Sequence, residues 1–191
     1  MFQLKIIIAS TRPGRKGPAV ASWIEGIARK HPAFEVTMLD LQKINLPFFD
    51  EPHHPRLQKY EHEHTKRWSE TIAGGDAFIF VTPEYNYGYT APLKNALDYL
   101  FIEWNYKPVA FVSYGGIAAG TRAVQMLKQV VTAQKMVPVT EAVNIPFFTK
   151  YIDDLERFNG DETLQKGADG MLIELAKWTA ALKGMREKYE V

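Results

Sequence analysis

Residues 77–100 read AFIFVTPEYNYGYTAPLKNALDYL, and this stretch decides the fold class. The apolar run at 77–81 is typical of a buried strand, residues 82–88 form a polar and aromatic loop, and residues 91–100 repeat apolar side chains at helical spacing. In an open α/β sheet, ligands bind in the crevice outside the carboxyl ends of the strands. A loop of Pro, Tyr, Asn and Gly in that place offers flat apolar faces together with backbone amides. We therefore expect it to bind a planar heteroaromatic ligand with polar edges.

A second strand–loop–helix unit opens the chain. Residues 4–9 are apolar except for Lys5, with three Ile in a row, and the loop at 10–18 leads into apolar residues at helical spacing over 19–28. The free N–H groups and the dipole of a helix N-terminus favour an anion, and Ser10, Arg12 and Arg15 add further donors. This loop predicts a phosphate site, although by itself it could equally be a cap and a solvated turn.

The other elements continue the alternation of strands and helices. They are an edge strand at 34–41, an exposed helix at 57–73 ended by Gly74-Gly75, a buried strand at 108–113, a helix at 122–134 with Thr121 as N-cap, a short strand at 136–139 and a closing helix at 161–189. The pattern predicts an α/β, flavodoxin-like three-layer sandwich: a five-stranded parallel sheet of order 2-1-3-4-5 with helices on both faces. We expect residues 1–191 to form a single flavodoxin-like domain around one such sheet.

Composition excludes several classes of function. The 191 residues include 23 basic and 22 acidic side chains, and this balance gives no electrostatic footprint for nucleic acid or for an anionic membrane. The absence of Cys excludes disulfides and thiolate metal sites, so redox chemistry would need a bound cofactor. The N-terminus is too short and too strand-like for a signal peptide, and we expect a cytoplasmic protein.

Three motifs together resemble the NADPH-dependent FMN reductase family. They are Ser10-Thr11-Arg12-Pro13-Gly14-Arg15, then Thr82-Pro83-Glu84-Tyr85-Asn86 with Leu93-Lys94-Asn95-Ala96, and finally Ser113-Tyr114-Gly115-Gly116 with Gly120 and Arg122. The resemblance implies a flavodoxin-like fold, bound FMN, NADPH or NADH as the electron donor, and a quinone, azo compound or free flavin as the acceptor. It also implies a homodimer or homotetramer.

The resemblance also assigns residues to the cofactor. Ser10, Arg12 and Arg15, with the backbone at Gly17, Pro18, Ala19 and Val20, would hold the FMN phosphate. Pro83, Glu84, Tyr85, Asn86 and Tyr87 would line the polar edge of the isoalloxazine ring, and Ser113, Tyr114, Gly115 and Gly116 would meet its pyrimidine end. No side chain is expected to be catalytic, because the flavin carries the chemistry.

Three hypotheses about function stay open at this point. The first hypothesis is an FMN-dependent oxidoreductase that passes electrons from NAD(P)H to a small organic acceptor by a ping-pong mechanism. The rival is a one-electron carrier of the flavodoxin type; such carriers tend to be strongly acidic, which the balanced charge disfavours. A weaker alternative is a flavin-binding or nucleotide-binding module without turnover.

Several aromatic and histidine residues invite other interpretations. His53, His54, His62 and His64 could suggest a metal site, but positions 62 and 64 are two apart on the expected helix and should point to different sides. We expect these histidines to be solvated, and Trp23 and Trp178 to belong to the core.

Large apolar residues gather near the expected crevice, namely Phe48-Phe49, Phe101, Trp104 and Phe147-Phe148. They predict a subunit contact through the helix at 93–100, unless each Phe pair folds under its own loop.

Overall fold

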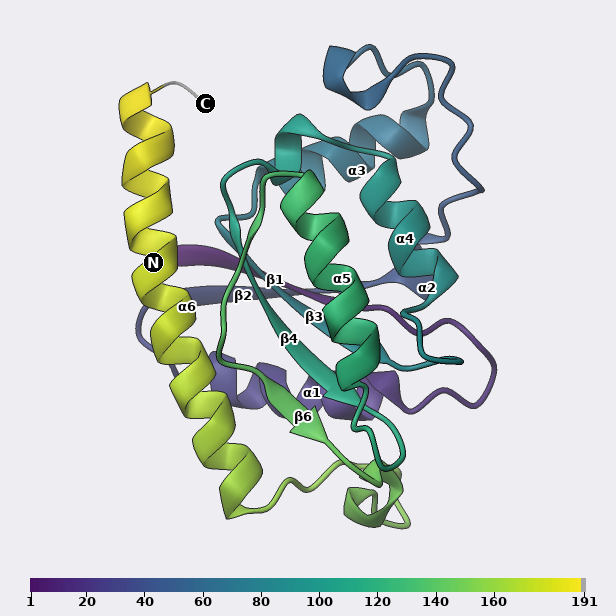
Figure 1. Ribbon diagram of the computed structural model, residues 1–191, viewed down its shortest axis with the longest axis vertical. Helices are drawn as coiled ribbons and strands as arrows, with labels where there is room; N and C mark the ends of the chain where they lie inside the picture. Colours follow the sequence, from purple (N-terminus) through teal and green to yellow (C-terminus); the bar gives the residue numbers. More distant parts are fainter. Residues whose placement is uncertain (190–191) are drawn as a thin grey trace.

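The computed structural model describes residues 1–189 and contains one parallel sheet between two layers of helices (Figure 1). The main strands are β1 (Phe2–Ile8), β2 (Phe34–Asp40), β3 (Ala77–Pro83) and β4 (Pro108–Tyr114). Every residue of β3 and β4 is buried, because helices cover both faces of these central strands. The order β2-β1-β3-β4-β5 confirms the prediction, including the edge position of β2.

The edge beyond β4 differs from the single strand predicted at 136–139. Strand β5 (Val137–Pro138) pairs only with the start of β4, and a separate strand, β6 (Val143–Ile145), pairs with the end of β4. The amides of Val137 and Val139 donate to the carbonyls of Lys107 and Val109 at 3.0 and 2.9 Å, so the Pro138 nitrogen faces away from β4, as expected for an edge strand. The sheet therefore has six strands in the five predicted positions, because β6 shares the edge position with β5 and was not predicted from the sequence.

The helices divide between the two faces of the sheet. Helices α1 (Gly17–Ala28) and α6 (Glu162–Tyr189) pack on one face, and α3 (Glu63–Ala73), α4 (Ala91–Asp98) and α5 (Thr121–Ala133) pack on the other (Figure 1). A short helix, α2 (Leu41–Ile44), follows β2 directly. No helix within residues 1–189 combines the length and apolarity needed to cross a bilayer.

The first residues of α3 and α5 differ from those predicted from the sequence. The helix predicted at 57–73 begins only at Glu63, after a 3-10 turn at Pro55–Leu57. Thr121 is the first residue of α5 and not its N-cap: Gly120 holds that position with a φ of 80°, and the Thr121 hydroxyl donates to the Ala118 carbonyl at 2.8 Å. A left-handed cap residue favours glycine, which explains why Gly120 precedes the helix.

Of the two tryptophans predicted in the core, Trp178 departs from the prediction and Trp23 follows it. Trp178 is 43% exposed, so its assignment to the core was wrong. The buried stripe of α6 continues from Leu175 through Thr179 to Leu182, which turns Trp178 away from the sheet. Trp23 is partly buried and packs against the core cluster beneath α1, where its ring lies edge-on against Phe158 with 5.2 Å between centroids.

Candidate functional site

A cavity of about 200 Å³ lies where the loops after β1, β3 and β4 meet. These loops follow the carboxyl ends of adjacent parallel strands, which is where ligands bind in open α/β sheets. Its lining consists of Ser10, Arg12, Arg15, Lys16, Pro83, Glu84, Tyr85, Tyr114, Gly115, Gly116 and Phe148. The fold therefore brings all three motifs found in the sequence to one place.

Two buried hydroxyl groups in this cavity have no hydrogen-bond partner within the described chain. They are Ser10 Oγ and Tyr114 Oη. Burial raises the pKa of Tyr114 to about 12, so its hydroxyl stays protonated near neutral pH and remains a donor. Buried polar groups in folded proteins are normally paired, and the unpaired hydroxyls fit a polar ligand such as a phosphate or a ribityl chain.

Gly17 keeps these hydroxyls accessible at the start of α1. A Cβ at this position would lie 2.2 Å from Ser10 Oγ and 2.8 Å from Tyr114 Oη. Any side chain would fill the space between the two hydroxyls. The sequence has glycine at the one point of the loop where the backbone must approach both groups.

Arg15 and Arg12 have different roles in the structure. Arg15 donates from Nη1 and Nη2 to the two carboxylate oxygens of Asp40, both at 2.6 Å, and Nη1 also donates to the Ser10 carbonyl at 2.6 Å. The hydrogen bonds with Asp40 raise the pKa of Arg15 and keep it charged. Arg15 thus anchors the loop to the end of β2, although it lines the cavity. Arg12 is exposed and has no ion-pair partner in residues 1–189, so its guanidinium is the one left to bind an anion.

The rest of the predicted phosphate backbone does not reach the cavity. Pro18 has no amide hydrogen, and Ala19 and Val20 donate their N–H groups to the Lys16 carbonyl at 3.2 and 3.4 Å. The Val20 side chain is buried in the core between α1 and the sheet. Lys16, which was not predicted, lines the cavity and pairs with Glu156 at 2.6 Å.

The loop after β3 forms a tight hairpin turn. Tyr85 and Gly88 exchange two backbone hydrogen bonds, both 2.9 Å, across Asn86 and Tyr87. Asn86 and Tyr87 have φ angles of 49° and 71°, and their exposed side chains lie outside the cavity. Of the five residues predicted to line the ring, the structure brings Pro83, Glu84 and Tyr85 to the cavity.

The end of β4 and the loop after it bring Tyr114, Gly115 and Gly116 to the cavity. Ser113 does not face the cavity: its buried Oγ donates to the Ala119 carbonyl at 2.8 Å and contacts Asn144 of β6 at 3.0 Å. The Ser113 hydroxyl thus stabilises the glycine-rich loop after β4. It also contacts β6, a strand that was not predicted from the sequence.

Phe148 is a cavity residue that sequence reasoning did not assign. It follows β6, and its ring meets the Tyr114 ring edge-on with 5.0 Å between centroids. The adjacent pair Phe147-Phe148 had marked this loop as unusual, but only the position of β6 places it beside Tyr114.

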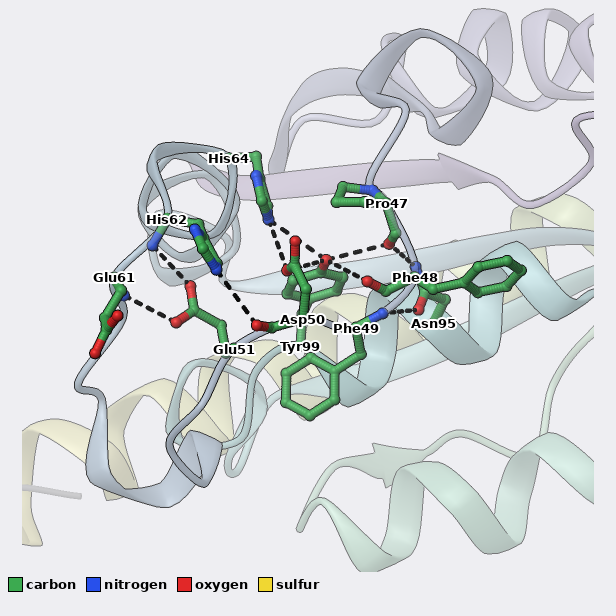
Figure 2. Close-up of polar contacts among 10 residues, drawn as sticks. All are labelled: Pro47, Phe48, Phe49, Asp50, Glu51, Glu61, His62, His64, Asn95 and Tyr99. Carbon is green, nitrogen blue, oxygen red and sulfur yellow. Dashed lines mark hydrogen bonds and ion pairs between the residues drawn. The ribbon is translucent and has the colours of Figure 1, made fainter.

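Two of the four histidines predicted to be solvated, His62 and His64, form part of a polar network (Figure 2), whereas His53 and His54 are exposed, as predicted. His62 lies just before α3 and not on it, and its ring stacks on that of His64 with 5.2 Å between centroids. The prediction that they point to different sides was wrong, because it assumed a helix through both positions. Among residues 1–189, no three His, Asp or Glu side chains are grouped so as to hold a metal ion.

This network fastens the loop at 46–62 to α3 and α4 (Figure 2). Asp50 Oδ1 lies 3.0 Å from His64 Nε2 and accepts a hydrogen bond from Tyr99 Oη at 2.9 Å. Asn95 accepts from the Phe49 amide at 3.0 Å and donates to the Pro47 carbonyl at 2.7 Å. The loop is therefore held by side chains of both helices.

Comparisons with known proteins agree with this geometry. A family model described as NADPH-dependent FMN reductase matches residues 3–150. A NAD(P)H-dependent FMN reductase of Schizosaccharomyces pombe is 39% identical over 176 residues, covering 83% of this chain and 88% of the relative. An NADPH:quinone oxidoreductase of Arabidopsis thaliana is 31% identical over 124 residues, covering 60% of this chain and 61% of the relative. The solved structure of the flavoenzyme NAD(P)H:(acceptor) oxidoreductase FerB from Paracoccus denitrificans has a TM-score of 0.74 at 21% identity, covering 95% of this chain and 98% of that chain. The structural likeness confirms the flavodoxin-like fold.

Proposed function

The chain belongs to the NADPH-dependent FMN reductase family, and from this premise we propose that it transfers electrons from NADPH or NADH to a small organic acceptor by a ping-pong mechanism. It is an oxidoreductase whose cofactor is FMN. The observation that carries the proposal is the cavity at the ends of β1, β3 and β4, whose walls hold two buried hydroxyls that have no hydrogen-bond partner among residues 1–189. FMN, when bound, supplies the redox chemistry, so the protein needs only to bind and orient.

The residues of the cavity divide by chemistry. At the α1 end, Ser10, Arg12 and the Gly17 amide offer a hydroxyl, a guanidinium and a helix N-terminus, which together suit a phosphate. At the other end, Pro83 and Tyr85 offer flat apolar surface, which suits the isoalloxazine ring. The glycines at 115 and 116 allow backbone to approach a ligand closely.

A quinone is the acceptor class we propose first. The Arabidopsis relative is named as an NADPH:quinone oxidoreductase, and an aromatic-walled crevice accommodates planar acceptors. With one crevice for both donor and acceptor, the two must take turns, which is the basis for a ping-pong order.

The test combines binding, reduction and steady-state kinetics. Purified protein should retain or rebind FMN, and rapid mixing with NADPH should bleach the visible absorbance of the flavin. Steady-state rates with a panel of quinones, azo dyes and free flavins should give parallel double-reciprocal lines. A protein that binds FMN but is not reduced by NADPH would support the electron-carrier alternative, and failure to bind FMN would refute the proposal.

We also propose that residues 1–191 act as one FMN-binding domain that assembles as a homodimer or homotetramer. An apolar groove of about 330 Å³ between α2 and α4 is lined by Leu41, Leu46, Pro47, Phe48, Ala91, Pro92, Asn95 and Ala96. Phe48 is 88% exposed beside it and Phe147 is 55% exposed on the loop after β6. Trp104, which we had counted with these residues, is fully buried against Phe78 and so belongs to the core.

Exposed apolar groups of this size favour burial in a subunit contact. Sedimentation of the FMN-loaded protein at micromolar concentration should give a mass of at least twice 21.8 kDa. The variant Phe48→Ser should shift the protein toward monomer, with Leu155→Ser, an exposed apolar residue outside the groove, as the control. A monomeric wild-type protein would refute the assembly and leave the redox proposal standing.

A further inference from the structure

The turn at residues 83–88 has a conformation that its own sequence only partly supports. Two-residue hairpin turns with two positive φ angles favour Asn followed by Gly. Asn86 suits the first position at a φ of 49°, but Tyr87 carries a side chain at the second, at a φ of 71°. A non-glycine residue in the left-handed region needs support from its surroundings. The structure provides that support from α5.

Arg122 contacts the turn at two points. Its Nε donates to Glu84 Oε1 at 2.5 Å, with Nη2 paired to the same oxygen. Its Cζ also lies 3.8 Å from the centroid of the Tyr87 ring, which is within the range of a cation–π contact. The hydrogen bond with Glu84 raises the pKa of Arg122, so the guanidinium stays charged. One side chain in the first turn of α5 therefore contacts both Glu84, at the start of the 83–88 turn, and Tyr87, at its tip.

Glu84 has a second oxygen that nothing in the described chain binds. The side chain is 7% exposed and lines the cavity, and Oε2 is buried without a hydrogen-bond partner in residues 1–189. A carboxylate paired with a guanidinium can only accept hydrogen bonds, so Oε2 requires a donor. The oxidised isoalloxazine ring carries a single N–H group, that of its imide, and this group is the donor that chemistry offers in the cavity.

We propose that Arg122 is a positioning residue of the cofactor site. By pairing with Glu84 and stacking on Tyr87, it fixes the 83–88 turn so that Glu84 Oε2 accepts a hydrogen bond from the imide N–H of the flavin. This inference rests on the proposed binding of FMN, and it assigns a role to an arginine that lies outside the cavity lining. Arg122 acts through Glu84 and does not touch the reacting atoms.

The test uses FMN affinity and the ionisation of the bound imide. A carboxylate beside the imide disfavours its deprotonation, so in the wild type the bound imide should ionise at a higher pH than in free FMN. In Glu84→Gln the ionisation should move back toward that of free FMN. FMN methylated at the imide nitrogen should bind the wild type about tenfold or more weakly than FMN, because a hydrogen bond to a charged group is lost.

Variants of Arg122 separate positioning from direct binding. Arg122→Ala should weaken FMN binding about tenfold and shift the imide ionisation, while the ratio of FMN to riboflavin affinity stays unchanged because the phosphate loop is intact. Arg122→Lys keeps the charge but loses the forked guanidinium and its stacking on Tyr87, so its FMN affinity should fall between those of the wild type and Arg122→Ala. Arg29→Ala removes an arginine that pairs with Glu25 at 2.7 Å on the outside of α1 and is the matched control.

The outcomes distinguish this inference from the proposed function on which it rests. If the Arg122 and Glu84 variants bind FMN with wild-type affinity and an unshifted imide, the inference is wrong, although the protein still binds FMN. If the wild type does not bind FMN at all, the proposed function and this inference both fail. If Arg122→Ala does not fold, the FMN affinity and imide ionisation of Arg122→Lys and Glu84→Gln test the same inference.

Discussion

Lys107 should make the stability of this protein rise with pH above neutrality. The residue lies immediately before β4, is 6% exposed, and donates from Nζ to the carbonyls of Ile72 and Ala73, both at 2.9 Å, at the end of α3. Burial, with the nearby guanidinium of Arg186, lowers the pKa of Lys107 from 10.5 to about 7. Desolvation disfavours the charged amine more than the helix end favours it.

The sign follows from proton binding. Between pH 7 and 10.5 the unfolded chain holds a proton on Lys107 that the folded chain has largely released, so the free energy of unfolding increases with pH in this window. Each pKa unit corresponds to about 1.4 kcal/mol, and linkage between the two pKa values gives a gain of roughly 2 kcal/mol from pH 7 to pH 9. Below pH 7 both states are protonated and this contribution levels off.

The assay is urea unfolding of the wild type and of Lys107→Met at pH 7, 8 and 9. Methionine keeps the length and removes the charge, and the loss of a donor to the two carbonyls costs the same at each pH, so the slopes are compared and not the absolute stabilities. Lys30→Met, at an exposed position, is the control and should follow the wild type. Parallel stability curves for the wild type and Lys107→Met would refute the reasoning.

Three further changes test the site and its supports. Arg12→Ala should weaken FMN binding by roughly 1.5–3 kcal/mol in a fluorescence titration without lowering stability, because a charge-assisted phosphate contact is removed; unchanged affinity would show that the phosphate lies elsewhere. Gly120→Ala should destabilise the fold by at least about 1–2 kcal/mol in urea unfolding, since its φ is 80° and a Cβ would lie 2.9 Å from Ser113 Cβ, whereas Gly116→Ala has open space and should cost little; equal effects would contradict this. Hydrogen bonds from the Arg157 backbone and side chain lower the pKa of Asp153 to about 2, so stability that Asp153 supplies above pH 4 should be lost as the pH falls toward 2, and Asp153→Asn should flatten this part of an acid-unfolding curve.

Much of the fold could be predicted because its determinants are local. The runs at 4–9, 77–81 and 108–113 are mostly apolar on both strand faces, with Lys5 as the charged exception, and this identifies central strands of a parallel sheet without knowledge of their partners. Alternation with helices then fixes the topology class. The ends of the same strands indicated the three loops that line the cavity.

The candidate site was only partly predictable, because side-chain roles depend on partners distant in sequence. Arg15 and Arg12 look equivalent in the sequence, but the guanidinium of Arg15 pairs with Asp40 at the end of a neighbouring strand. Phe148 reaches the cavity only because β6 returns to the sheet beside the end of β4. No local pattern contains that information.

The sequence by itself determined the fold class, the family and the three loops of the candidate site, because hydrophobic periodicity, glycine positions and short motifs act within a few residues. Tertiary structure alone decided which groups in those loops remain available to a ligand. Within residues 1–189 the hydroxyls of Ser10 and Tyr114 are unpaired, while the Ser113 hydroxyl and the Arg15 guanidinium are taken by contacts within the protein. A polar side chain binds whichever partner the packed chain brings within hydrogen-bond distance, and that depends on contacts between strands far apart in the sequence.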